Sequence, residues 1–222
     1  MNLQRRLLAE FLGAAGLLVV VVGSGIMGET LSQGNAAIAL LAHSVATGAG
    51  LYALIQTYGP VSGAHFNPAV SFVEFLWKRL SATELALFSI VQVTGAVAGV
   101  FATHVMFGQA VIQLSRHDRS EYRFLLSEAI ASFGLIMVIS LSGKKNVFAT
   151  PMAVALYITG AYWCTSSTSF ANPAVTIARS LTDTFSGIQW TGAPVFIIAQ
   201  IAGAMLAFWV SKFLSAEESS SS

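Results

Sequence analysis

Two short stretches decide the fold of this chain: Phe66-Asn67-Pro68-Ala69-Val70 and Ala171-Asn172-Pro173-Ala174-Val175. Each lies late in a run without Asp, Glu, Lys or Arg, at residues 30–73 and 146–178. Each run is too long for one membrane crossing, which takes about 20 apolar residues. Proline disfavours helical geometry in the residue before it, so no helix is expected to pass through Asn-Pro. Each run therefore predicts a spanning helix, a turn and a short re-entrant half-helix that begins at Asn-Pro.

The composition of the whole chain places these runs in a lipid bilayer. Its 222 residues are 55% hydrophobic and 9% charged, with a mean hydropathy of +0.71, whereas soluble domains carry about 25% charged residues. A formal net charge of +1 provides no basic stripe for nucleic acid. The single cysteine, Cys164, excludes an intramolecular disulfide. The residues show neither metal-ligand spacing nor a catalytic arrangement, so we expect no cofactor, no metal and no enzymatic activity.

Four further apolar runs complete the expected topology, at residues 7–27, 85–107, 124–142 and 184–211. The fold class is therefore an all-α membrane protein with six transmembrane helices and two re-entrant half-helices, forming a single channel domain over residues 1–222. We expect the first run to be an uncleaved helix rather than a signal peptide, and residues 215–222 to be a disordered tail.

The distribution of basic residues predicts the orientation. With six spans, seven of the eleven Lys and Arg residues fall on one side of the membrane, which the positive-inside rule assigns to the cytoplasm together with both termini. These seven are Arg5, Arg6, Lys78, Arg79, Lys144, Lys145 and Lys212.

The two halves of the chain, about residues 5–114 and 121–214, repeat one order of motifs: Glu, then Asn-Pro-Ala-Val, then Gln-x-x-Gly-Ala. The motifs begin at Glu10, Asn67 and Gln92 in the first half, and at Glu128, Asn172 and Gln200 in the second. Three spans per repeat is an odd number, so the copies must be inverted, and such repeats place their special segments near the bilayer midplane. The two half-helices are therefore expected to meet N-terminus to N-terminus.

The Asn-Pro-Ala segments predict a pore at this meeting point. Pro68 and Pro173 suit a first helical turn, and Asn67 and Asn172 suit the N-cap. Each asparagine then keeps an amide NH2 that can point into a lumen and orient a passing hydroxyl. Two positive helix ends repel cations, and irregular backbone at this depth is tolerated only when it is buried or lines a water-filled cavity.

These motifs give the sequence a resemblance to the aquaporin (major intrinsic protein) family over about residues 5–214. Ala9-Glu10-Phe11 and Ser62-Gly63-Ala64-His65 belong to the same pattern, as do Ala69 and Ala174. The resemblance implies a homotetramer in membrane lipid, with one pore per subunit for small neutral solutes. It also implies a pore-lining His65, and buried Glu10 and Glu128 that support the half-helix loops.

The chain departs from the family directly after the second Asn-Pro-Ala, where Val175 replaces the arginine of the selectivity filter. Ungapped counting places the other filter positions at Thr47, Gly160 and Ser169. These four residues predict a wide, weakly polar opening without an aromatic ring or a guanidinium. The pattern resembles a bacterial subgroup encoded with arsenic-resistance genes, which implies an inner-membrane protein that passes arsenous acid, methylated arsenicals, small polyols and water.

Two side chains near this opening each have two interpretations. Arg179, one turn beyond Val175, either leans toward the outer vestibule or forms an i,i+4 pair with Asp183. His43, one turn before Thr47, either lines the outer vestibule or faces protein or lipid.

Three other functions are the alternatives to this channel. One is an ordinary water channel. Another is a coupled secondary transporter that uses Glu10 or Glu128, because inverted repeats also occur in that class. The third is an adhesive junction protein with a closed lumen.

Overall fold

The computed structural model describes residues 2–142 and 149–216, and its regular structure there is entirely helical. The eight helices are α1 (Leu3–Leu31), α2 (Ala36–Ser62), α3 (Pro68–Leu76), α4 (Ala82–Met106), α5 (Tyr122–Ser142), α6 (Ala149–Cys164), α7 (Pro173–Arg179) and α8 (Ala193–Ala216). Five of them, α1, α2, α4, α5 and α8, are long and apolar enough to cross a membrane. The sixth predicted span corresponds to α6, which has 16 described residues.

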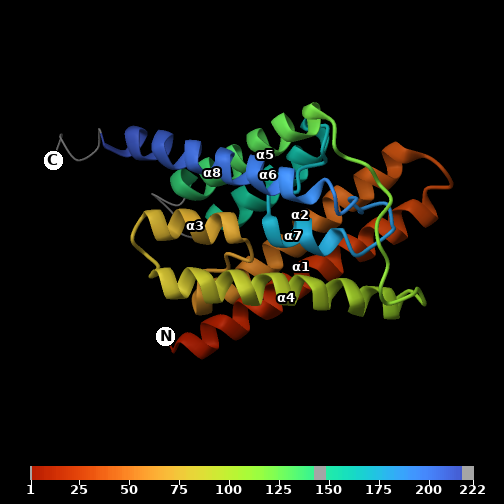
Figure 1. The fold of residues 1–222 in the computed structure, drawn as a ribbon, viewed down its shortest axis with the longest axis horizontal. Helices are drawn as coiled ribbons and strands as arrows, with labels where there is room; N and C mark the ends of the chain where they lie inside the picture. The colour runs from red at the N-terminus through yellow and green to blue at the C-terminus, as the bar shows by residue number, and fades with distance from the viewer. Residues whose placement is uncertain (1, 143–148, 217–222) are drawn as a thin grey trace.

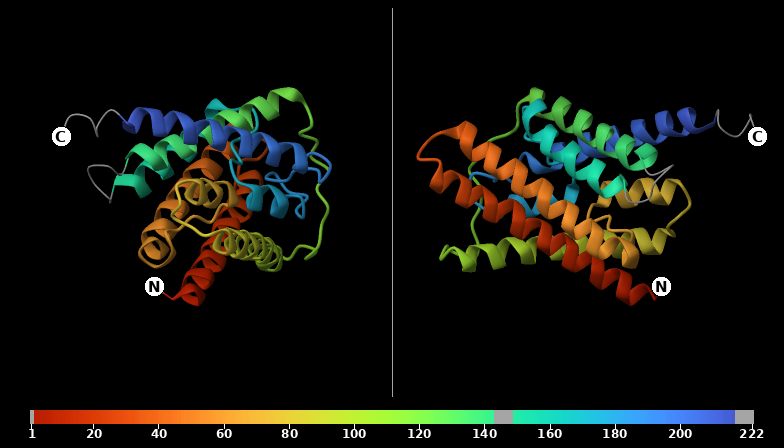
Figure 2. Two further views of the ribbon diagram at one scale, coloured as in Figure 1. Left: turned by 60° about the vertical axis from the view of Figure 1, so that its left-hand side comes forward. Right: turned by 180° about the vertical axis from the view of Figure 1, so that it is seen from behind.

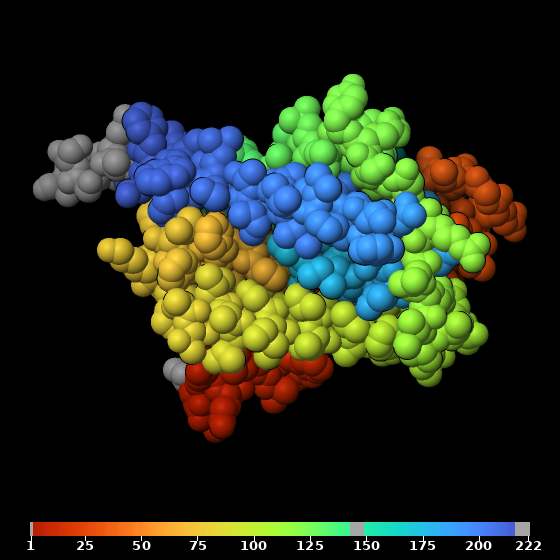
Figure 3. Space-filling model, in the orientation of Figure 1, coloured from red at the N-terminus to blue at the C-terminus, as the bar shows by residue number. Residues whose placement is uncertain are grey.

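The half-helices α3 and α7 occupy the middle of the molecule (Figure 1). The pair α1 and α4 lies on one side of them and the pair α5 and α8 on the other, each pair in extensive contact. Seen from behind, α1, α2 and α6 cover the opposite face (Figure 2). On the face shown in Figure 3, α3 and α7 lie between α4 and α8. This arrangement is the predicted inverted repeat.

Helix α1 begins and α8 ends at the same end of the molecule (Figure 1). We call this the terminal end, and the opposite end the distal end. From the centre, α3 runs toward the terminal end and α7 toward the distal end. Of the seven residues on the predicted cytoplasmic side, Lys144 and Lys145 lie outside the described residues.

Two predicted boundaries are corrected. The uncharged run at 184–211 is not one helix: α8 begins at Ala193, and the preceding residues form turns. Their backbone groups find partners outside a helix, since the Ile188 N–H donates to the Arg179 carbonyl and the Gln189 N–H to the His117 carbonyl. The predicted disordered tail begins too early, because α8 continues through Ala216, while its remainder, 217–222, lies outside the described residues.

The repeated Gln-x-x-Gly motif is explained by the packing of the paired helices. A Cβ atom on Gly95 would collide with the carbonyl of Phe11 in α1, and one on Gly203 would collide with the carbonyl of Ala129 in α5. Glycine at these two positions therefore lets α4 approach α1, and α8 approach α5, with their backbones in contact.

Candidate functional site

Each half-helix begins with an asparagine that caps it. The Ala69 N–H donates to Asn67 Oδ1 at 2.9 Å, and the Ala174 N–H donates to Asn172 Oδ1 at 2.9 Å. Proline follows each asparagine at the first helical position, where its missing N–H leaves no bond unmade.

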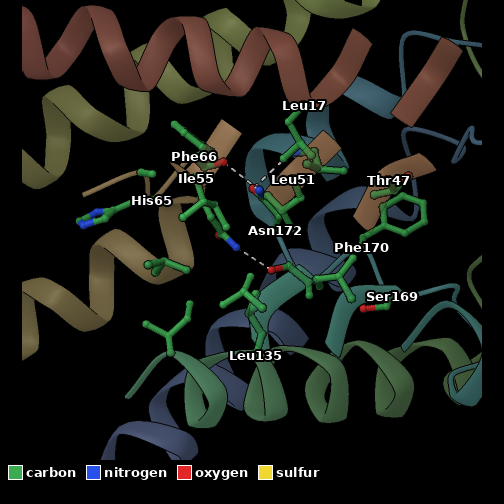
Figure 4. Close-up of a pocket in the computed structure, with 18 of the residues that line it drawn as sticks. Leu17, Thr47, Leu51, Ile55, His65, Phe66, Leu135, Ser169, Phe170 and Asn172 are labelled. Atoms are coloured by element: carbon green, nitrogen blue, oxygen red, sulfur yellow. Dashed lines mark hydrogen bonds between the residues drawn. The ribbon is translucent and has the colours of Figure 1, made fainter. Parts of the chain in front are cut away.

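The two asparagines also bind each other's loops. Asn67 Nδ2 donates to the carbonyl of Ala171, and Asn172 Nδ2 donates to the carbonyl of Phe66, each at 2.8 Å (dashed lines in Figure 4). This corrects the expectation that both amide NH2 groups are entirely left for the lumen. One N–H of each amide links the two halves of the chain, and the other makes no hydrogen bond within the part of the chain that the structure describes.

A buried carboxylate holds the loop before each half-helix. Glu10 accepts hydrogen bonds from the backbone N–H groups of His65 (3.0 Å) and Phe66 (2.7 Å). Glu128 accepts from those of Phe170 (2.9 Å) and Ala171 (2.8 Å).

These loop bonds offset an unfavourable backbone conformation. Phe66 and Ala171, each directly before its asparagine, have φ values of 48° and 47°, a left-handed region that non-glycine residues seldom adopt. The side-chain amides of Gln92 and Gln200 donate to Glu10 and Glu128, at 2.8 and 2.6 Å. The repeated Glu and Gln of the sequence thus form one loop-supporting arrangement in each half.

A cavity of about 270 Å³ runs past the asparagine pair. Of the predicted site residues, those that line it are Thr47, His65, Asn67, Ser169, Asn172, Val175 and Arg179. In Figure 4, His65 lies at one side of Asn172, and Thr47 and Ser169 lie at the other. Much of the remaining wall is aliphatic, with residues that include Leu17, Leu51, Leu135 and Val154.

Gly160 is not among the residues that line the cavity, which corrects the prediction for this helix. It is exposed, and a Cβ atom added to it would have no neighbouring atom within 4 Å. Val154, Ile158 and Tyr162 form the cavity-facing stripe of α6 instead. With 3.6 residues per turn, Gly160 lies nearly opposite Tyr162 on the helix. Counting back from Asn172 gave the wrong residue because a count along the chain does not say which face of α6 turns inward. The i, i+4 spacing of Val154, Ile158 and Tyr162 marks that face.

The prediction of an opening without an aromatic ring or a guanidinium is wrong, because Tyr162 and Arg179 both line the cavity. Tyr162 Oη donates to Thr47 Oγ1 at 3.3 Å, at the distal end of the cavity. Arg179 is buried, and its guanidinium carbon lies 3.4 Å from the centre of the Phe170 ring. Residues 175 and 179 share a helix face, so Arg179 reaches the wall that Val175 leaves uncharged.

The proposed pairing of Arg179 with Asp183 is wrong. Arg179 Nε donates to the carbonyl of Ser186, and Asp183 interacts with Arg116, whose backbone N–H it accepts at 2.9 Å.

His43 faces protein and does not line the cavity. It is buried, with Nδ1 2.8 Å from Ser24 Oγ and its ring edge-on to Tyr162, at 4.9 Å between centroids. Of its two interpretations, the vestibule-lining one is therefore incorrect.

Two charged residues near the cavity were not singled out in the sequence. Arg119, in the loop between α4 and α5, donates to the carbonyls of Ser167 and Gly187, each at 3.0 Å, and its guanidinium lies 5.3 Å from the centre of the Phe170 ring. Burial lowers the pKa of this guanidinium below its usual range, partly offset by the Glu128 carboxylate. Glu74, in α3, lines the cavity itself. The sequence gives no indication of Arg119, because its hydrogen-bond partners lie 48 and 68 residues further along the chain.

Comparison with known proteins agrees with this architecture. The profile of the family Major intrinsic protein matches residues 1–146 and 119–221. The chain is 47% identical over 213 residues to "Aquaglyceroporin AqpS" of Rhizobium meliloti (strain 1021), covering 96% of this chain and 91% of that protein. It is 28% identical over 244 residues to "Aquaporin AqpM" of Methanothermobacter marburgensis, covering 97% and 99%.

Among solved structures, the aquaglyceroporin from Plasmodium falciparum superimposes with a TM-score of 0.75 at 18% sequence identity, covering 94% of this chain and 95% of that one. The fold is therefore the aquaporin fold. Half-helices meeting at the centre, paired asparagines and a cavity past them accompany a family match over both halves of the sequence. The chain belongs to the major intrinsic protein family, and it is a passive membrane channel for small solutes rather than an enzyme.

Proposed function

We propose that the cavity is the conduction path, and that it passes water and small uncharged molecules that carry hydroxyl groups: arsenous acid, methylated arsenicals in uncharged form, and small polyols such as glycerol. The observation that carries this proposal is the ring of polar groups at the distal end of the cavity. Thr47, Tyr162, Ser169 and Arg179 supply three hydroxyls and a guanidinium there.

Two groups of this ring keep hydrogen-bonding capacity that the protein does not use. Within residues 2–142 and 149–216, Ser169 Oγ has no hydrogen-bond partner, and the guanidinium of Arg179 makes one hydrogen bond, from Nε. Buried donors and acceptors that lack hydrogen-bond partners favour a ligand that supplies those hydrogen bonds. The aliphatic part of the cavity wall suits the carbon skeleton of a polyol, or the side of arsenous acid that carries the arsenic lone pair and no hydroxyl. The selectivity filter is thus proposed to be Thr47, Tyr162, Ser169 and Arg179, with Val175 beside it.

The name of the Rhizobium relative supports polyols as substrates, since that protein is called an aquaglyceroporin. The position of the loop carboxylates disfavours a coupled transporter. Glu10 and Glu128 are fully buried behind the loops and are occupied by backbone and glutamine N–H groups. A proton-coupling group needs access to the transported solute or to water, and neither carboxylate is among the described residues that line the cavity.

The assembly and placement proposed for the channel follow the family pattern: a homotetramer in the bacterial inner membrane, forming a single channel domain with both termini in the cytoplasm. The terminal end would then be the cytoplasmic end. The exposed apolar side chains on the outside of the helices, among them Ile90, Leu156 and Ile198, fit lipid or neighbouring subunits.

Stopped-flow swelling of proteoliposomes tests the proposed solutes. Vesicles with the channel should swell in glycerol and arsenous acid much faster than empty vesicles, and an uncoupler should not change these rates. Val175→Arg should reduce glycerol and arsenous acid flux far more than water flux, because it adds a second long cation beside Arg179. Val175→Leu, which adds volume without charge, is the matched control and should have a smaller effect.

Three results would contradict the proposal. Solute accumulation that depends on a proton gradient would favour a transporter. Water flux without glycerol or arsenous acid flux would favour an ordinary water channel. No swelling in any solute would favour a closed lumen.

A further inference from the structure

Glu74 and Arg179 occupy equivalent positions in the two halves of the chain. Each is seven residues after the asparagine that caps its half-helix, Asn67 or Asn172, and each side chain lines the cavity. At a rise of 1.5 Å per residue, each lies about 10 Å along its helix axis from that asparagine. Because α3 and α7 run in opposite directions (Figure 1), a carboxylate lies toward the terminal end of the cavity and a guanidinium toward the distal end.

The distal end carries positive charge that acidic side chains do not pair. Neither Arg179 nor Arg119 forms an ion pair with Asp or Glu within the ranges 2–142 and 149–216. Both guanidinium groups lie against Phe170, beside the cavity. Such groups repel cations, but arginine in a pore favours anions. This end alone favours small anions over cations, so a negative group elsewhere on the path would add to the desolvation cost that anions meet in a largely aliphatic cavity.

Among the described residues that line the cavity, Glu74 is the one carboxylate. Its partner Arg79 binds it from the solvent side, with Nη1 3.1 and 3.3 Å from its two oxygens. The Arg79 side chain is 65% exposed and that of Glu74 is 16% exposed. Water screens the exposed guanidinium of Arg79 more strongly than the largely buried carboxylate of Glu74. The net electrostatic potential inside the cavity at this end is therefore negative.

We propose that Glu74 is the anion barrier of this channel, and that Glu74 and Arg179 together exclude small ions of both signs while uncharged solutes pass. The inference rests on the proposed function, because it takes the cavity to be the conduction path. It assigns Glu74 a role in charge selectivity, separate from the role of the polar ring in choosing among neutral solutes.

The test measures nitrate and glycerol entry into the same proteoliposomes. With external potassium nitrate and valinomycin present, potassium crosses freely and swelling reports nitrate entry. Wild-type vesicles should swell no faster than empty ones in this medium, while Glu74→Gln, which removes the charge and keeps the shape, should raise nitrate entry by about tenfold or more. Glu74→Asp should restore the barrier, and Arg79→Gln should leave both nitrate and glycerol entry as in wild type.

A cysteine variant that can be modified after folding keeps the test valid if Glu74→Gln misfolds. In a Cys164→Ser background, Glu74→Cys should admit nitrate, a negatively charged methanethiosulfonate reagent should close this path, and a neutral reagent of similar size should not.

The outcomes separate this inference from the function on which it rests. Wild-type vesicles without glycerol flux would contradict the conduction path, and the inference would fall with it. Glycerol flux through wild type and variants, with nitrate excluded from Glu74→Gln and from unmodified Glu74→Cys, would overturn the role of Glu74 alone. Nitrate entry through wild type as fast as through Glu74→Gln would also overturn it.

Discussion

Asn67 and Asn172 each donate a hydrogen bond of 2.8 Å to the loop that precedes the other. Each asparagine therefore does two things at once: its oxygen caps its own half-helix, and its nitrogen fastens the opposite one. This reciprocity makes the pair a structural joint of the fold as well as part of the proposed conduction path.

Removing one asparagine should therefore cost more than removing an ordinary cap. Asn172→Ala loses a cap worth about 1 kcal/mol and a buried hydrogen bond worth about 1 kcal/mol. Asn35→Ala, which loses only the exposed cap of α2, is the control. Thermal unfolding in detergent should show a larger decrease in Tm for Asn172→Ala, with reduced glycerol flux. Equal decreases for the two variants would show that the cross-link contributes nothing.

The contact between α1 and α4 should not tolerate a single added methyl group. Gly95→Ala places a Cβ atom against the Phe11 carbonyl, and overpacking of this kind costs about 1–3 kcal/mol. Gly160→Ala adds the same methyl group to α6, where it would meet no neighbouring atom within 4 Å, and helix propensity favours alanine there. Tm in detergent should fall for Gly95→Ala and remain unchanged or rise for Gly160→Ala. A Tm for Gly95→Ala equal to that of the wild type would contradict the close backbone contact.

On α6, Tyr162 rather than Gly160 should influence selectivity. Tyr162→Phe removes a hydroxyl from the polar ring, and one hydrogen bond corresponds to a change of about two- to tenfold. The ratio of glycerol to water flux should therefore fall by about that factor. Gly160→Ala, on the exposed face, should leave the ratio unchanged. A change in the ratio for Gly160→Ala, with none for Tyr162→Phe, would restore the filter expected from sequence counting.

Arg179 should exclude cations. Arg179→Gln removes the guanidinium from the cavity wall, so vesicles loaded with a sodium-sensitive dye should report sodium entry that wild-type vesicles lack. Arg116→Gln is the matched control, because Arg116 lies in the α4–α5 loop with a side chain that is 90% exposed. Sodium entry that is the same in the two variants would mean that Arg179 is not a barrier.

The repeated motifs were readable from the sequence because each one reports a local requirement. Asn-Pro specifies a capped helix start, an intramembrane Glu requires a partner, and Gly in Gln-x-x-Gly permits close approach. Such requirements depend on few neighbours, so Asn67, Asn172, Glu10, Glu128 and the inverted repeat were all identifiable without coordinates.

By itself, then, the sequence determined that this chain crosses a bilayer as an inverted repeat with two half-helices that begin at Asn-Pro. Only the tertiary structure decided which side chains meet at the ends of the cavity. There, Tyr162 replaces Gly160, Arg179 occupies the space beside Val175, and Glu74 lies at the end opposite Arg179, while Arg119 packs against Phe170 from a loop. The physical reason is that a contact in the cavity depends on helix rotation and side-chain reach. Both are set by packing between segments far apart in the chain, whereas a cap or a proline acts within one turn.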